Sequence, residues 1–279
     1  MRKNHLIQHY LDKLASFHLY FKRTLEGQEI EDIHQLRVTI KKLRAMYALM
    51  ELATRGTLKK KECFALFSKL FDEAGKVRDA QVSLSIIERS KARYLVSFAE
   101  NLRTIQKHAN EKLLTSMQAF DFKRLEMLNN KLLQAMKELS VEIVIRESVT
   151  YILKEVRNVY VLKDHLPDNR KLHKIRIRLK AVIEILTIMN ELDATLRLEE
   201  LRNNFKSIEK QIGKWHDYII LLASLNYFTN QTRLKSKVGY LTNLIGRIET
   251  QQEVRQQAIH QSINKYITQQ QLEQIENLL

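Results

Sequence analysis

Residues 33–44 have the sequence IHQLRVTIKKLR, in which apolar and basic residues follow each other with the period of an α-helix. At ~100° per residue, Arg37, Lys41 and Arg44 fall within roughly 80° of His34 on a helical wheel. The leucine and isoleucine residues of the inner part of the stretch fall on the opposite side, which is the side that a helix buries. The stretch therefore predicts a helix with one apolar face and one face of histidine, arginine and lysine.

The same spacing of histidine, arginine and lysine occurs a second time, at His173, Arg176 and Lys180. A second motif is repeated as well, because residues 75–79 (GKVRD) correspond to residues 213–217 (GKWHD). The histidine precedes the glycine by 41 residues in the first copy and by 40 in the second. Two motifs that are shifted together by nearly the same distance indicate an internal duplication.

The composition favours helix along the whole chain, since 279 residues include one proline and six glycines. No run of alternating β-branched residues is long enough to favour a sheet. We predict an all-α protein of two tandem, pseudo-symmetric helical bundles, residues 1–139 and 140–279, with about four principal helices each. No glycine-, serine- or proline-rich linker lies near the boundary, so the two bundles are expected to pack tightly.

Local signals predict where several helices end. Gly75 and Gly213 are expected to end one helix in each half, because glycine is the residue that most often follows a helix. Asp79 and Asp217 are then expected to cap the short helices that follow, a structural role rather than a catalytic one. A last break is predicted near Ile259.

The charge balance indicates an anionic partner. Lysine and arginine exceed aspartate and glutamate by 47 to 32, giving a net charge of +15 at pH 7. Nucleic acid, an anionic membrane surface or another polyanion would suit such a protein. The single cysteine, Cys63, excludes an intramolecular disulfide, favours a reducing compartment and is expected to be buried. The longest apolar run, residues 218–228, is too short to span a bilayer, so we expect a cytoplasmic protein without a membrane span.

The basic face of the first copy has no acidic neighbours, because no aspartate or glutamate lies between residues 33 and 50. Exposed helices normally mix both signs so that residues four apart can pair. An uninterrupted basic face therefore predicts an anionic ligand rather than simple solvation. The second copy is weaker, since Ala181 and Ile183 stand at the positions that correspond to Lys42 and Arg44.

The residues that we predict to bind the anion lie on these two faces and beside the two glycine motifs. They are His34, Arg37, Lys41, Lys42, Arg44, Lys76 and Arg78 in the first half, and His173, Arg176, Lys180, Lys214 and His216 in the second. Arginine offers a planar fork for two phosphate oxygens, and lysine offers a mobile positive charge. Histidine adds a contact that depends on protonation, so binding is expected to be tighter near about pH 6 than near about pH 8.

No catalytic centre, metal site or cofactor is predicted. The basic faces lack the carboxylates that would hold Mg²⁺, and glycine-rich phosphate loops are absent. His5 and His9 are one helical turn apart but have no evident third ligand, so both are expected at the surface. Aromatic residues recur at core spacing instead of between lysines and arginines, which disfavours base stacking and therefore nucleic acid.

The motifs resemble those of the CHAD family, the histidine-bearing α-helical domain. Residues 32–44 (DIHQLRVTIKKLR), residues 172–180 (LHKIRIRLK) and the two Gly-Lys-x-x-Asp motifs carry the resemblance, which covers essentially the whole chain. It implies two helical bundles whose basic side chains converge on a central cavity or channel and bind inorganic polyphosphate or phosphate-like anions, free or in polyphosphate granules. Members of the family often carry a fused triphosphate-tunnel catalytic domain, for which 279 residues leave no room, so a stand-alone binder is expected.

Polyphosphate binding without catalysis is therefore the first hypothesis. The main alternative is a nucleic-acid- or granule-associated binding protein that uses the same basic surface. An enzyme acting on phosphoanhydrides would need carboxylates for Mg²⁺ among the basic residues. A purely structural helical scaffold is the last alternative, and reversing the charges of Arg37 and Lys41 would leave such a scaffold unaffected.

Overall fold

The computed structural model describes residues 2–90, 92–164, 168–231 and 235–277, and all the secondary structure that they form is helical. The first half contains α1 (Arg2–Gly27), α2 (Ile30–Ala53), α3 (Lys60–Ser90), α4 (Val96–Gln118) and α5 (Phe122–Glu138). The second half contains α6 (Val141–Lys163), α7 (Asn169–Leu192), α8 (Glu199–Gln231), α9 (Lys235–Tyr266) and α10 (Gln269–Glu276). Two 3₁₀ turns, η1 (Arg93–Leu95) and η2 (Ala194–Leu196), precede α4 and α8. The predicted all-α class is confirmed.

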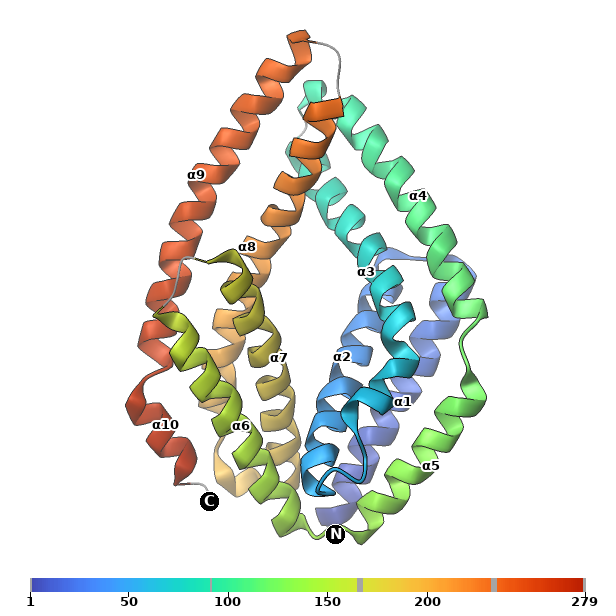
Figure 1. Ribbon diagram of the computed structural model, residues 1–279, viewed down its shortest axis with the longest axis vertical. Coiled ribbons are helices and arrows are strands. Elements are labelled where there is room, and N and C mark those ends of the chain that lie inside the picture. Colours follow the sequence, from blue (N-terminus) through green and yellow to red (C-terminus); the bar gives the residue numbers. More distant parts are fainter. Residues whose placement is uncertain (1, 91, 165–167, 232–234, 278–279) are drawn as a thin grey trace.

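The two halves stand side by side, with α2 and α7 facing each other in the middle (Figure 1). Helix α2 of the first half packs against α7 of the second, and α3 packs against α8. The long pairs α3–α4 and α8–α9 extend beyond the rest of the bundle and converge at one end of the molecule, which we call the apex (Figure 1). The connection between α5 and α6 and both chain ends lie at the opposite end.

One continuous apolar core runs through both halves, and a second one lies at the apex. Leu36, Ile40 and Leu43 of α2 belong to the first core and are 0% exposed, as the helical wheel predicts for the apolar face. We call the second one the apex core; it joins helices of both halves. Its members include Ile87, Leu95, Phe98 and Leu102 from the first half and Leu221, Leu225, Leu241 and Ile245 from the second.

The prediction that Gly75 and Gly213 end helices is wrong. Both glycines lie inside uninterrupted helices, α3 and α8, so Asp79 and Asp217 do not cap any helix. A glycine in a helix interior costs only about 1 kcal/mol relative to alanine, which the packing of a long helix easily offsets. The predicted break near Ile259 is also wrong. Ile259 lies inside the continuous helix α9, is 1% exposed and packs in the first core.

Two predictions about single segments can be compared with the fold. Cys63 of α3 is buried, as predicted, at 5% exposure. Residues 218–228 belong to α8, where Leu221 and Leu225 are 0% exposed in the apex core. Among the helices of the described ranges, none has the length and apolar character needed to cross a membrane.

A histidine joins the two halves at the end of α7. The His9 side chain of α1 lies between two carboxylates of α7, with Nδ1 2.7 Å from Glu191 Oε2 and Nε2 3.2 Å from Glu184 Oε1. The predicted surface position is wrong for His9, which is 3% exposed, because α7 of the other half covers it. His5 is exposed, and its Nδ1 lies 3.0 Å from the backbone oxygen of Glu191. We call the contact of His9 with Glu184 and Glu191 the histidine latch.

Candidate anion-binding site

The basic faces of the two repeats meet where α2 packs against α7 and α3 packs against α8. We define the central cluster as the basic side chains there whose charges influence one another. Its members are His34, Arg37, Lys41 and Arg78 of the first half and His173, Arg176, Lys180 and His216 of the second. The structure therefore brings together eight of the residues that the sequence predicted to bind an anion.

Lys41 and Lys180 contact each other across the two halves through a side-chain hydrogen bond. Burial, together with the charges of Lys180 and Arg37, lowers the pKa of Lys41 to about 6. Burial also lowers the pKa of Lys180, although a side-chain hydrogen bond with Lys41 opposes that shift. A neutral Lys41 amine can accept this bond from the Lys180 ammonium. The arrangement shows that the free cluster resists holding all of its positive charges at once.

In the first half, an aromatic ring and a glycine position Arg37. The guanidinium lies over the Phe71 ring with Cζ 4.4 Å from the ring centroid, and Nη1 donates a hydrogen bond of 2.5 Å to the Phe71 backbone oxygen. Gly75 is one turn further along α3, and a Cβ built there would lie 2.6 Å from Arg37 Nη1. The absence of a side chain at Gly75 therefore makes room for Arg37, a close approach that explains glycine inside a helix.

In the second half, the arginine and the lysine contact a carboxylate, Glu209, instead of an aromatic ring. Glu209 Oε1 lies 3.2 Å from Arg176 Nε and 3.1 Å from Lys180 Nζ, so one oxygen bridges both cations. Gly213 again makes room for the arginine, because a Cβ built there would lie 3.2 Å from Arg176 Nη2. The same positions of the two repeats thus hold equivalent cations with different partners.

The histidines of the cluster lie near other basic groups whose charges lower the histidine pKa values. Burial lowers the pKa of His34, and the charge of Arg78 adds to this effect. The His173 and His216 rings lie 4.8 Å apart, centroid to centroid. Burial followed by the charge of Arg176 lowers the pKa of both, and that of His216 falls to about 4. In the free protein the histidines are therefore mainly neutral at neutral pH.

The sequence did not predict three carboxylates that interact with the cluster: Asp79, Asp217 and Glu209. Although the Asp79 side chain is exposed, the protein packed around it raises the pKa of its carboxyl. Burial likewise raises the pKa of the half-buried Asp217, and the charge of Arg176 opposes the shift. Both aspartates follow the repeated glycines by four residues, and this spacing could have placed them on the face that packs against α2 and α7.

The comparison with known proteins agrees with this architecture. Residues 7–226 match the family model of the CHAD domain. The chain belongs to the CHAD domain family. Among solved structures it is similar to the crystal structure of the CHAD domain from the plant Ricinus communis, with a TM-score of 0.73 and 17% sequence identity over 94% of this chain and 91% of that chain. At this identity the similarity concerns the fold, and a search of curated proteins returned no match.

The remaining predicted residues lie outside the central cluster of this CHAD domain. Lys76 is exposed and pairs with Glu73 of its own helix at 2.9 Å. Arg44 lies over the Phe64 ring, with Cζ 4.6 Å from the centroid. Lys42 is half-buried on α2 and Lys214 is exposed on α8. Among the described residues, the main charges that shift the pKa values of the cluster do not include Lys42, Lys76 or Lys214.

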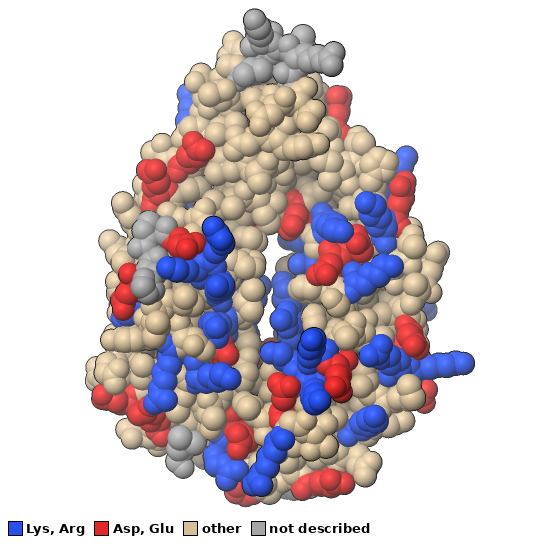
Figure 2. Space-filling model, viewed as in Figure 1, with Lys and Arg blue, Asp and Glu red and all other residues tan. Residues whose placement is uncertain are grey.

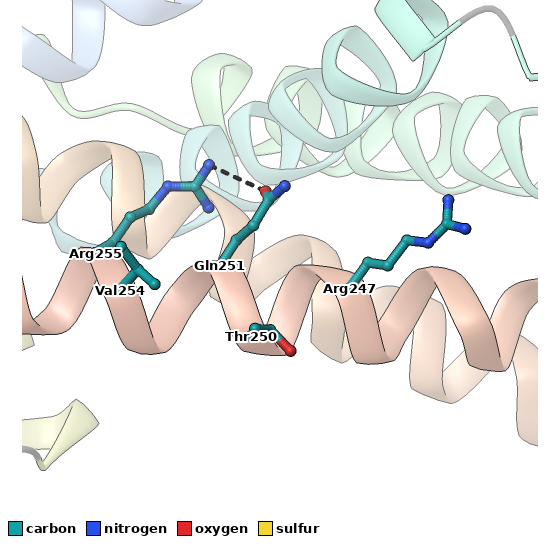
Figure 3. Close-up of a pocket in the computed structure, with 5 residues that line it drawn as sticks. All are labelled: Arg247, Thr250, Gln251, Val254 and Arg255. Carbon is teal, nitrogen blue, oxygen red and sulfur yellow. Dashed lines mark hydrogen bonds between the residues drawn. The ribbon is translucent and has the colours of Figure 1, made fainter.

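An opening runs between the two halves of the CHAD domain below the apex (Figure 2). Lysine and arginine side chains line much of its edge in this view, whereas the surface of the apex is mainly uncharged (Figure 2). A second hollow, lined by Arg247, Thr250, Gln251, Val254 and Arg255, involves α9 alone (Figure 3). We base the candidate site on the central cluster, because cations of both repeats converge there. No three His, Cys, Asp or Glu side chains of the described ranges are grouped as metal ligands.

Proposed function

We propose that the protein binds inorganic polyphosphate at the central cluster without catalysing its turnover. The observation that carries the proposal is the approach of Lys41 to Lys180 across the two halves, in a half-buried position where burial lowers the pKa of each lysine. Cations held in this way are stabilised when an anion lies among them. A phosphate chain carries negative oxygens at every repeat and can therefore contact the cations of both halves at once.

The chemistry of the individual side chains supports the same ligand. Arg37 and Arg176 present planar guanidinium groups that match pairs of phosphate oxygens, and Lys41 and Lys180 add mobile charges. The opening between the halves suits an extended polymer better than a compact anion (Figure 2). We propose that this opening is the basic channel through which the chain passes, in the cytoplasm or at polyphosphate granules.

The main alternative ligand is a single-stranded nucleic acid. Its bases would need aromatic rings to stack on, but Arg37 covers Phe71 and Arg44 covers Phe64. A nucleic acid could then use only its phosphates, and its binding would follow total charge rather than the geometry of the cluster. Catalysis with Mg²⁺ would need unpaired carboxylates, but Glu209 is paired with Arg176 and Lys180. Asp79 and Asp217 likewise lie within the influence of the Arg176 charge.

The test compares long-chain polyphosphate with single-stranded DNA of equal charge at about 150 mM salt, where nonspecific contacts are largely screened. The variant Arg37→Glu/Lys41→Glu reverses two charges inside the cluster. Lys76→Glu/Lys214→Glu reverses two charges outside it and is the matched control. We expect the wild type to prefer polyphosphate, the first variant to lose binding and the control to retain most of it.

Two outcomes would overturn the proposal. Equal affinity of the wild type for both polymers would reduce the cluster to general electrostatics. Equal loss in both variants would show that total charge, not the cluster, decides binding. If the five Lys and Arg side chains of the cluster all contact phosphate, the slope of log K against log salt should be roughly −3 to −4, by analogy with single-stranded nucleic acid.

A further inference from the structure

The duplication makes residues of the two halves directly comparable. Gly75 and Gly213 are equivalent, and four residues before each of them stand Phe71 and Glu209. One turn before each glycine, the chain thus has an uncharged ring in the first repeat and a carboxylate in the second. Both side chains contact the arginine and lysine of their own half.

The first-half contact holds the cations without neutralising them. Arg37 Cζ lies 4.4 Å and Lys41 Nζ 5.6 Å from the centroid of the Phe71 ring. A ring face attracts a cation through its quadrupole, but it carries no net charge. The charge of Arg37 therefore remains available to a phosphate, and Lys41, whose pKa is lowered to about 6, can take up a proton and contact the same phosphate.

The second-half contact does neutralise the cations. Glu209 Oε1 accepts from both Arg176 Nε and Lys180 Nζ, as one oxygen of a bound phosphate would. The Glu209 side chain is only 18% exposed, and those of Arg176 and Lys180 are 20% and 29% exposed, so these pairs are screened less than surface pairs. A phosphate that reaches the same two cations must compete with this carboxylate.

We propose that Glu209 is a tethered anion that occupies the second-half phosphate position in the free protein and so determines how tightly, and in what order, the two halves engage the ligand. A phosphate group binds first to Arg37 and Lys41. It reaches Arg176 and Lys180 only by displacing Glu209. This proposal rests on the proposed function, because it assigns an order to the contacts within the same site.

An alternative role makes the opposite prediction. If Glu209 only holds Arg176 and Lys180 in position for the ligand, removing its charge should weaken binding. If Glu209 competes with the ligand, removing its charge should strengthen binding. The direction of the change in affinity therefore distinguishes a competitor from a positioning residue.

The experiment is a titration of the intact protein with long-chain polyphosphate for the wild type, Glu209→Gln and Glu200→Gln. Glu200 lies on the same helix, is exposed and undergoes the same change of charge, so it controls for net charge. We expect Glu209→Gln to bind roughly three- to tenfold more tightly, which is the range for a partly exposed ion pair. We expect Glu200→Gln to stay within about twofold of the wild type, because an exposed and distant charge is screened.

The first part of a second comparison leaves Glu209 in place and therefore does not depend on how the Glu209→Gln variant folds. Arg37→Gln should weaken binding more than Arg176→Gln does, since Arg176 must first be released from Glu209. In the Glu209→Gln background the two losses should become equal. Unchanged or weaker binding by Glu209→Gln, or equal losses in the presence of Glu209, would overturn this inference alone. Absence of polyphosphate binding by the wild type would instead overturn the proposed function.

Discussion

Replacing Gly75 by alanine tests whether the glycine is there to admit Arg37. A Cβ at this position would lie 2.6 Å from Arg37 Nη1, closer than a real Cβ atom approaches another heavy atom, and 3.3 Å from Cζ, a tight contact. The backbone of α3 is an ordinary helix at this point, so the alanine itself is not strained. The expected response is therefore a movement of the flexible guanidinium away from α3.

The effect on stability should be small, because two terms nearly cancel. Alanine stabilises a helix interior by about 1 kcal/mol relative to glycine. Moving the guanidinium costs its hydrogen bond to the Phe71 oxygen, about 1 kcal/mol, and its contact with the ring, about 0.5–1 kcal/mol. The free energy of unfolding should therefore fall by no more than about 1 kcal/mol. The affinity should fall much more, because losing one charged hydrogen bond to the ligand, about 1.5–3 kcal/mol, lowers affinity roughly 10- to 100-fold.

Gly213→Ala is the matched control, because its Cβ would lie 3.2 Å from Arg176 Nη2, a distance that a shift of a few tenths of an ångström relieves. We expect this variant to gain about 0.5–1 kcal/mol of stability from helix propensity. Its polyphosphate affinity should change by less than about threefold, because Arg176 stays in place. Urea unfolding and polyphosphate titration measure the two effects separately. Full affinity of Gly75→Ala would refute the argument, as would a loss of stability above about 3 kcal/mol, which would indicate displacement of the helix instead of the guanidinium.

Two further predictions concern titratable groups. Since the pKa of Lys41 is lowered to about 6 in the free protein and a bound anion restores its charge, binding takes up a proton. Polyphosphate titrations at about pH 8 and about pH 6 should show tighter binding at the lower pH for the wild type and for His34→Gln. Lys41→Arg should show little change, because arginine stays charged at both pH values. Loss of the pH dependence in His34→Gln and its retention in Lys41→Arg would assign it to the histidine. In the histidine latch, His9→Leu leaves the buried Glu184 unpaired and should lower the free energy of unfolding by about 2–4 kcal/mol. The exposed His5→Ala should change it by less than about 0.5 kcal/mol, and similar urea midpoints for the two variants would contradict a stabilising latch.

The parts of the site that could be predicted from sequence are those that follow from the period of one helix. The wheel of α2 places Leu36 and Ile40 on the buried face and Arg37 and Lys41 on the other, and the structure has both apolar residues at 0% exposure. The repeated spacing extends the same argument to α7. Periodicity is informative here because burial of one face of a helix depends on neighbours three and four residues apart.

The parts that could not be predicted depend on contacts between helices. Gly75 looked like a helix end because glycine destabilises helices, but its role is set by Arg37, which lies 38 residues earlier in the chain. Asp79 then looked like a cap only because a helix was expected to begin there. Glu209 had no local signal at all, and only comparison with Phe71 of the other repeat shows that this position contacts the cations.

The order of features along the inner helices explains how mutually repelling cations stay together in the absence of a ligand. On α7 the basic residues of the cluster precede the histidine latch, and on α3 they precede the apex core. The cluster therefore lies between two regions where the halves are joined, by the contacts of His9 with two carboxylates at one end and by the apex core at the other. Because both regions are fixed by packing, burial and the repulsion from Lys180 lower the pKa of Lys41, and the halves stay together. The candidate site is thus already assembled without a ligand, and the proposed binding need not include the conformational cost of bringing the two basic faces together.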